Sequence, residues 1–212
     1  MKRPILIVLL LLLATSVSAQ HRRHSKANTF DFTIRGGMNM CQIDGDADGN
    51  YNKLGYHLGV NTTFPVSHDN ENLRFLVEIG VSNKGSKVKA MHRTFSATYI
   101  EIPLLLTYHF GNYQDQGLRL GIGFAPAILG KASVDDDGER RPTLEQNFRR
   151  MDALPFCFDV QYRINEHFGF QARFCNSLLP ITKEASQGTY RIFRENKGAF
   201  HRLIQAGVLY RF

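Results

Sequence analysis

Residues 203–212 read LIQAGVLYRF and alternate in character. One parity is apolar or aromatic and the other is mixed: Ile204, Ala206, Val208, Tyr210 and Phe212 against Leu203, Gln205, Gly207, Leu209 and Arg211. A two-residue period is the signature of a strand with one apolar face. A terminal strand of this kind leaves an exposed edge unless both of its edges are paired. We therefore expect this segment to close a sheet into a ring by pairing with the first strand.

Earlier runs with the same period cover residues 29–38, 54–64, 73–83, 99–110, 118–129, 153–164 and 168–178. Each is about 10–12 residues long, the length of a tilted strand that crosses a bilayer. The connections 39–53, 84–98, 130–152 and 179–199 are long, whereas 65–72, 111–117 and 165–167 are shorter. This asymmetry is typical of outer-membrane barrels. The sequence predicts an all-β fold: an eight-stranded antiparallel up-and-down transmembrane β-barrel with periplasmic N- and C-termini.

The two faces of the predicted strands differ in size and charge. The apolar parity carries large Phe, Leu and Ile side chains in every run, more than a small ligand cavity could hold. The other parity is rich in Gly and carries both signs of charge, as a narrow lumen filled by side chains requires; Leu76, Leu105 and Leu209 are its exceptions. We expect the apolar face to meet lipid. The alternative is a soluble, lipocalin-like periplasmic carrier whose apolar face surrounds a ligand.

The start of the chain predicts export. Lys2 and Arg3 precede the apolar run 5–14, and small residues follow it. This order predicts a cleavable signal peptide over residues 1–19 and a barrel domain over residues 20–212. Export makes nucleic-acid binding a poor interpretation of the formal net charge of +7, so no nucleic-acid partner is expected.

Charged residues on the inward parity predict a lumen cluster. Its members are Arg35, Glu78, Glu101, Arg119, Asp159, Arg163 and Arg173. They must pair, because an unpaired buried charge costs several kcal/mol. A three-residue turn at 165–167 would set Asp159 opposite Arg173 and Cys157 opposite Cys175. A structural plug is the favoured interpretation over an ion or proton path, because eight strands leave little free bore.

The sequence offers little for catalysis or metal binding. Two small buried thiols are expected at Cys157 and Cys175, with a cross-strand disulfide as the alternative. Inward histidines and serines specify no catalytic triad, so we expect no catalytic residue and no cofactor. A membrane-embedded lipid-modifying enzyme is the more remote alternative.

A short acidic segment has the opening of a calcium loop. Asp44, Asp46 and Asp48 alternate and Gly49 follows, but position twelve of such a loop would be Gly55 instead of the bidentate Glu. A solvated acidic loop without a metal is therefore expected.

Four stretches carry a family resemblance: GGMNMCQIDGDADGNYNKLGYHLGV (36–60), VSNKGSK (81–87), YIEIPLLLTYHF (99–110) and VLYRF (208–212). They resemble the PorT-like outer-membrane β-barrel family of Gram-negative envelopes. The resemblance implies an outer-membrane barrel of unassigned biochemical activity, and the family's named member is tied to protein export through the type IX secretion system. We expect a porin-like, non-enzymatic barrel that is a structural or accessory envelope component, and an association with protein secretion is the role that this member suggests. Secretion-system components are the partners that it implies.

Two further kinds of partner are expected. Tyr210 and Phe212 look like the signal that the barrel assembly machinery reads by strand addition. The loop segments 131–150 and 182–202 mix basic and aromatic residues. Such loops suit outer-membrane lipid and the phosphates of lipopolysaccharide.

Overall fold

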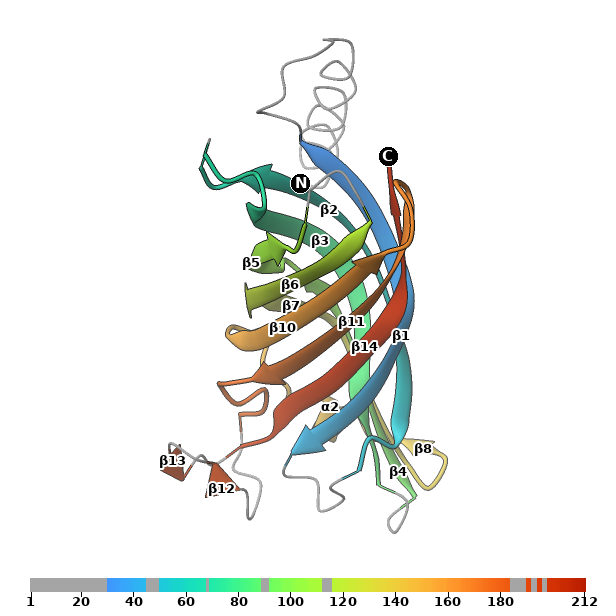
Figure 1. Ribbon diagram of the computed structural model, residues 1–212. Helices are drawn as coiled ribbons and strands as arrows, with labels where there is room; N and C mark the ends of the chain where they lie inside the picture. Colours follow the sequence, from blue (N-terminus) through green and yellow to red (C-terminus); the bar gives the residue numbers. More distant parts are fainter. Residues whose placement is uncertain are drawn as a thin grey trace, which may run out of the picture.

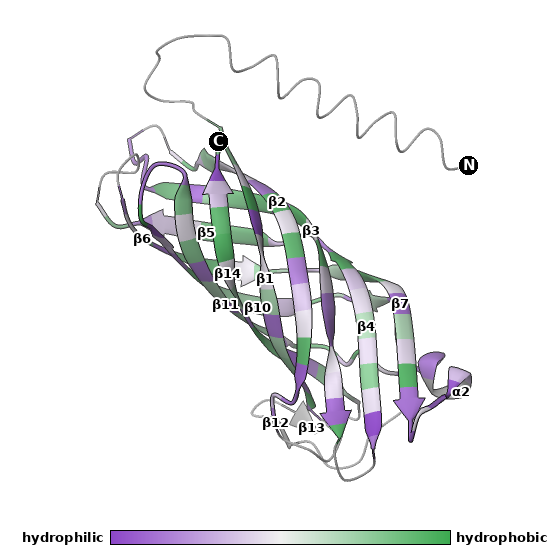
Figure 2. Cartoon of the chain, turned by 90° about the vertical axis from the view of Figure 1, so that its right-hand side faces the viewer, coloured by the Kyte–Doolittle hydropathy of each residue, from purple (hydrophilic) through white to green (hydrophobic). Residues whose placement is uncertain are grey.

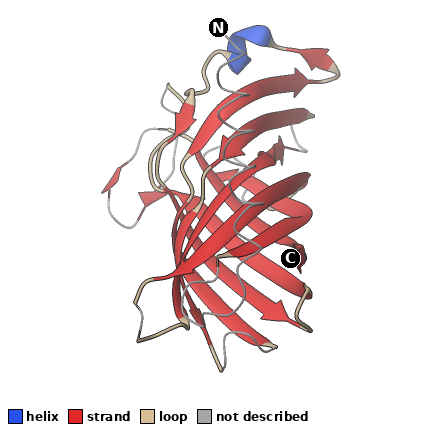
Figure 3. Ribbon diagram, turned by 90° about the horizontal axis from the view of Figure 1, so that it is seen from above, coloured by secondary structure: helices blue, strands red, loops and turns tan. Residues whose placement is uncertain are grey.

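The period-two runs become strands that pair in chain order around a ring in the computed structural model (Figure 1). The structure describes residues 30–44, 50–67, 69–88, 92–111, 116–183, 190–191, 194–195 and 198–212. The predicted signal peptide, residues 1–19, lies outside this range, as do Asp46 and Asp48. Within it, the only helix is the short α2, Pro142–Glu145 (Figure 3), and no helix is long and apolar enough to cross a bilayer.

The result is a closed, eight-stranded antiparallel barrel, which confirms the predicted fold. The continuous barrel strands are β1 Asp31–Asp44, β2 Lys53–Pro65, β3 Leu73–Val88, β11 Phe168–Ser177 and β14 Phe200–Arg211. The remaining barrel strands are each built from consecutive segments: β4 Arg93–Glu101 with β5 Leu104–His109, β6 Gly117–Phe124 with β7 Ala127–Asp136, and β9 Met151–Asp152 with β10 Pro155–Arg163. Three two-residue strands lie in the long loops: β8 Glu139–Arg140, which pairs with the end of β7, and β12 Tyr190–Arg191 and β13 Arg194–Glu195, which pair with each other.

The last strand closes the ring, as the period of residues 203–212 predicts. β14 pairs with β11 on one edge and with β1 on the other, where Tyr210 faces Ile34. Beyond the ladder, the Phe212 N–H donates to the Phe32 carbonyl at 3.0 Å. No edge of β14 is left for another chain along these residues.

The apolar parity faces outward and the polar parity fills the interior. Leu58 is 61% exposed, whereas Arg173 is 1% exposed. This arrangement is the reverse of a soluble ligand carrier, so the lipocalin-like alternative is wrong. The inward Leu76 and Leu105 are fully buried and share an apolar layer with all three cysteines, Cys41, Cys157 and Cys175.

The strands are longer than predicted at the long-loop end. β1 continues to Asp44, β3 to Val88 and β7 to Asp136, while β4 already begins at Arg93. The predicted loops 39–53, 84–98 and 130–152 are therefore partly strand. In the extensions of β3, β4 and β7 the outward residues carry no apolar side chain, as at Asn83, Thr98 and Lys131, and the apolar period that marks a lipid-facing strand stops where they begin. In β1 the outward Met40 is still apolar and 41% exposed. Figure 2 shows the lower ends of β3, β4 and β7 turning pale and purple.

Three adjacent strands are interrupted beside a proline, which has no N–H to give to a ladder. The breaks lie at Pro103, at Pro126 and just before Pro155. Each proline carbonyl still accepts a hydrogen bond from the neighbouring strand, at 2.9 Å in every case. The donors are the N–H groups of Glu78, Ile102 and Ala125, respectively. The barrel wall thus stays bonded across all three breaks.

Aromatic rings meet one another at the short-turn end of the barrel. The contacting pairs are Phe30 with Phe64, Phe64 with Phe75, Tyr108 with Phe110, Phe32 with Phe212, Tyr210 with Phe212 and Phe168 with Tyr210. Their location matches the aromatic girdle of a membrane barrel.

Candidate functional site

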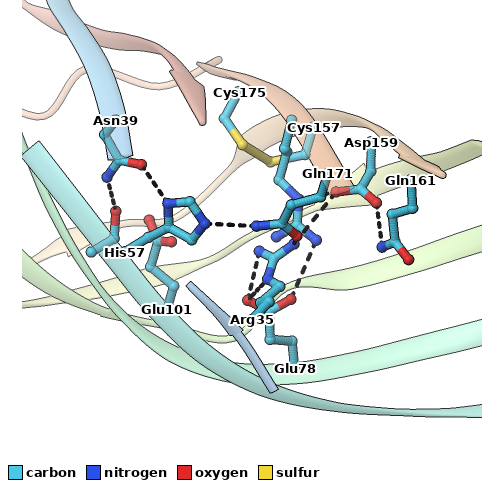
Figure 4. Close-up of polar contacts among 12 residues, drawn as sticks. Arg35, Asn39, His57, Glu78, Glu101, Cys157, Asp159, Gln161, Gln171 and Cys175 are labelled. Atoms are coloured by element: carbon cyan, nitrogen blue, oxygen red, sulfur yellow. Dashed lines mark hydrogen bonds and ion pairs between the residues drawn. A yellow bond between two sulfur atoms is a disulfide. The ribbon is translucent and has the colours of Figure 1, made fainter. Parts of the chain in front are cut away.

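A closed network of ion pairs occupies the middle of the lumen (Figure 4). Arg35 lies 2.6 Å from Glu78 and 3.4 Å from Asp159. Arg173 contacts the same two carboxylates, at 3.3 Å and 2.6 Å respectively. Each arginine thus bridges both carboxylates, and the four charges sum to zero. We refer to these residues as the central network.

Local sequence explains how the central network is assembled. The β10–β11 ladder has the predicted register, with Asp159 opposite Arg173. Across the lumen, Gly59 leaves room for Glu78: a Cβ atom there would lie 2.7 Å from Glu78 Oε1. The glycine on the inner face therefore allows the carboxylate to reach Arg35.

A chain of hydrogen bonds leads from the central network toward the long-loop end. Arg35 Nη1 donates to Gln171 Oε1 at 2.9 Å, and the Gln171 amide lies 2.6 Å from His57 Nε2. On its other side, His57 Nδ1 lies 3.0 Å from Asn39 Oδ1. His57 therefore bonds two amides, not a serine, and Ser82 instead accepts a hydrogen bond from Asn39. The side chains hold one another in place and form no nucleophile–base pair.

Glu101 belongs to a different layer, nearer the long loops. It pairs with Lys84 at 2.5 Å. Beside this pair, Tyr99 bonds His201 at 3.2 Å, and Lys84 lies over the Tyr99 ring. Sequence reasoning missed Lys84, although it lies in the VSNKGSK segment, because the predicted strand ended one residue before it.

Arg119 and Arg163 lie at the short-turn end, apart from the central network. Both are buried. Arg163 Nη2 lies 3.4 Å from His109 Nε2, and Arg211 forms a 2.7 Å ion pair with Asp31 in the same half of the lumen. The predicted cluster is thus three layers instead of one, because the tilt of the strands spreads the inward positions along the axis.

Segments that carry the family resemblance converge on one point between β1, β2 and β3. Lys53 Nζ donates to Asn83 Oδ1 at 2.6 Å. Asn39 Nδ2 donates to the carbonyls of Tyr56, at 2.9 Å, and Asn83, at 3.0 Å. A Cβ atom on Gly55 would clash with the Asn83 carbonyl, so this close strand contact requires glycine.

Cys157 and Cys175 form a disulfide, so the expectation of two thiols is wrong. The two residues face each other in the β10–β11 ladder with a Cα–Cα distance of 4.3 Å. Directly opposed residues approach this closely at non-hydrogen-bonded positions of an antiparallel pair, which brings the two sulfurs together. Cys41 is a free, buried thiol.

Of the acidic segment Asp44, Asp46 and Asp48, only Asp44, the last residue of β1, lies within the described residues. Asp44 pairs with Arg202 at 2.8 Å and accepts a hydrogen bond from Gln42 at 2.9 Å. Among the described residues, no group of three or more His, Cys, Asp and Glu side chains is placed to hold a metal ion.

Two long loops are strapped together at the long-loop mouth. Phe148 and Thr182 form an antiparallel bridge, and the Arg149 N–H donates to the Ile181 carbonyl at 2.7 Å. Phe148 and Ile181 pack in an apolar cluster with Ile43, Val134 and Ala199. The strap therefore lies over the end of the lumen, above the Lys84–Glu101 layer.

Burial of the central network argues against an aqueous pore. A water-filled bore would leave its lining side chains accessible to water, as in wide barrels. The members of the central network are at most 4% exposed. The arrangement can hold the barrel closed, and it offers no continuous aqueous path through this layer.

The C-terminal residues lie at the short-turn end. Tyr210 stacks on His167 with ring centroids 5.6 Å apart, and Arg211 N–H donates to the His167 carbonyl at 2.7 Å. Phe212 is 59% exposed. The turn at 165–167 thus holds the end of β14 in place.

Comparisons with known proteins point to one class. The family model described as "Outer membrane protein beta-barrel domain" matches residues 18–183. The structure of Neisserial surface protein A (NspA) is similar to the chain, with a TM-score of 0.50 and 15% sequence identity over 85% of this chain and 97% of that one. Ail of Yersinia pestis has a TM-score of 0.46 and 11% identity over 86% and 97% of the two chains. OprG of Pseudomonas aeruginosa has a TM-score of 0.42 and 13% identity over 87% and 97%. A search of curated proteins finds no match.

Proposed function

Because this chain belongs to the outer membrane protein β-barrel domain family, we propose that it is a closed, non-conducting barrel that serves as a structural or accessory component of the envelope. It is an integral outer-membrane protein. The observation that carries the proposal is the central network, whose neutral set of charges fills the lumen at full burial. A side-chain plug of this kind favours a scaffold over a channel.

Conductance measurements test the closed state. Purified barrel reconstituted in planar bilayers should show no steady channel current. Heat-modifiable gel mobility of the reconstituted sample shows that folded barrels are present in the bilayers. A steady current through the unmodified protein would overturn the proposal.

We also propose that the short-turn end and both termini face the periplasm. Long loops on the outside and short turns inside are the rule for outer-membrane barrels. Glu139, in a long loop, and Glu166, in a short turn, are both exposed. On intact cells, a membrane-impermeant maleimide should label Glu139→Cys and leave Glu166→Cys unlabelled until the outer membrane is permeabilised. The opposite pattern would invert the orientation.

A role in protein export is the second candidate. It is supported by the resemblance of segments 36–60 and 81–87 to PorT-like barrels. In this chain the two segments contact each other, because Asn39 and Lys53 both donate hydrogen bonds to Asn83. Deletion of the gene, followed by comparison of secreted proteins and of detergent sensitivity, separates the candidates. Loss of secreted proteins in cells with an intact envelope favours export. Detergent sensitivity with unchanged secretion favours the structural role.

The proposed function includes no catalysis. The partners of His57 and Ser82 are amides, and Ser177 donates to Asp152 at 2.6 Å. Lipid A extracted from the deletion strain should therefore have the parental composition. Loss of a lipid A modification would instead favour a lipid-modifying enzyme.

A further inference from the structure

Beyond the apolar belt, β3, β4 and β7 continue as a three-stranded ribbon. Its last outward apolar row is Val81, Ile100 and Ile128, which are 40%, 46% and 52% exposed. The ladder pairs Asn83 with Thr98 and Thr98 with Lys131 in the next outward row. A third row holds Gly85, Ser96 and Ser133. The outward surface thus changes from hydrocarbon to amide, hydroxyl and ammonium groups within one row.

Hydrogen bonds within this surface leave the hydroxyl hydrogens of Ser96 and Thr98 available to a ligand. Lys53 Nζ donates to Asn83 Oδ1 at 2.6 Å. The Asn83 amide in turn donates to Ser96 Oγ at 3.2 Å and to Thr98 Oγ1 at 3.0 Å. Because each hydroxyl oxygen already accepts a hydrogen bond, its own hydrogen is left to donate outward.

Lys131 adds a positive charge to the same row. It is exposed and lies beside Thr98 in the ladder. Within the part of the chain that the structure describes, no carboxylate forms an ion pair with it. Two hydroxyl donors, in adjacent rows, and one ammonium therefore lie on the same face, and the nearby carboxylate of Glu145 is paired with Arg140.

We propose that Ser96, Thr98 and Lys131 form a docking site for a phosphate group of lipid A, the anchor of outer-leaflet lipopolysaccharide. Charge-assisted hydrogen bonds from hydroxyls and an ammonium are the contacts that a phosphate prefers. A lipid whose acyl chains cover Ile100 and Ile128 places its phosphate at the height of the next row. The site rests on the proposed orientation for its contact with the outer leaflet.

Nanodiscs test the site independently of that orientation, because lipid A can be supplied in both leaflets. Barrels are reconstituted with phosphatidylcholine plus bisphosphorylated lipid A, dephosphorylated lipid A or phosphatidylglycerol. Native mass spectrometry then measures the lipid retained on each barrel. The unmodified protein should retain bisphosphorylated lipid A in preference to the other two lipids.

Thr98→Val combined with Lys131→Gln should weaken retention of bisphosphorylated lipid A about tenfold, the effect of losing one or two charge-assisted hydrogen bonds. Lys87→Gln is the matched control, since Lys87 lies on the same face one row beyond Ser96 and should leave retention unchanged. Equal melting temperatures show that the variants fold alike. The inference would be overturned if the unmodified protein retained dephosphorylated lipid A, or phosphatidylglycerol, as well as it retains bisphosphorylated lipid A. A double variant that binds like the unmodified protein would also overturn it.

Discussion

The arginines of the central network each serve two carboxylates, which makes single losses costly. Removing Asp159 leaves Arg35 and Arg173 with Glu78 alone, an excess of one buried positive charge. Breaking a buried pair in this way costs about 3–5 kcal/mol. Asp159→Ala should therefore lower the free energy of unfolding by that amount, measured by urea titration in detergent micelles.

Asp159→Ala combined with Arg173→Ala should be less destabilised than the single variant, because Arg35 and Glu78 remain as a neutral pair. Glu139→Ala, on an exposed loop side chain, should change stability by less than about 0.5 kcal/mol. Equal stabilities of the single and double variants would show that the network does not share its charges.

The residue-level prediction from sequence succeeded where it needed only one hairpin. The length of the turn at 165–167 was enough to set Asp159 opposite Arg173. The contacts of Arg35 and Glu78 with this pair depend on ring closure and on strand tilt. The periodicity of a single strand predicts neither of these. Glu101 was placed in one predicted lumen cluster with these residues for the same reason, although it pairs with Lys84 in a different layer.

The cysteines give a second test at this scale. Unfolded without reductant, the protein should take up one maleimide, on Cys41, because Cys157 and Cys175 are joined. After reduction it should take up three, since the chain contains three cysteines. Mass spectrometry counts the adducts. Three adducts before reduction would mean that the disulfide is absent from the protein as isolated from the oxidising periplasm.

At the scale of elements, periodicity located every barrel strand but not where four of them begin or end. Ile100 and Ile128 still face lipid, whereas the next outward residues, Thr98 and Lys131, are polar. In β4 and β7 the apolar side chains move to the inner face, at Phe95, Ala97 and Val134, so the outward apolar period that identified the lipid-facing strands ends. The ribbon was therefore assigned to loops. The proline breaks were also missed, because the apolar parity runs through Ile102 and Leu104 without interruption.

The tip of the ribbon should respond to acid. Arg93 donates to both Asp136 oxygens, at 3.0 Å and 2.8 Å, and this hydrogen bonding holds the pKa of Asp136 below its ordinary value. Because the pKa of Asp136 is lowered in the folded state, its carboxylate stabilises the tip at every pH above the ordinary carboxyl pKa. This stabilisation is lost as the pH falls through the lowered value. Hydrogen exchange, corrected for intrinsic rates, should show protection of residues 93–98 weakening severalfold only well below pH 4.

Asp136→Asn should show the weaker protection already at neutral pH, since an amide cannot replace the ion pair with Arg93. Asp137→Asn, at the neighbouring exposed turn position with positive φ, is the matched control and should behave like the unmodified protein. Protection that persists in Asp136→Asn would assign the stability of the tip to the ladder alone.

At the scale of the whole molecule, closure of the ring and the expected role of Phe212 as an assembly signal can be tested separately. Phe212 joins β1 through its backbone N–H, which Phe212→Ala retains. If the side chain is a signal for the assembly machinery, this variant should refold normally in detergent and yet accumulate less folded barrel in outer-membrane fractions. Heat-modifiable mobility on gels measures both. Phe168→Ala, which removes another girdle ring at the same end, should leave both unchanged.

The geometry of the central network bears on how the chain enters the membrane. Its shortest contacts lie within each half of the chain: Arg35 with Glu78, and Asp159 with Arg173, both at 2.6 Å. The contacts that join the halves are longer, at 3.4 Å and 3.3 Å. In an assembly intermediate made of β1–β3, or of the β10–β11 hairpin, the charges that belong to the central network are therefore already paired. Each pair can form before the ring closes, and closure then joins the two pairs through the longer contacts.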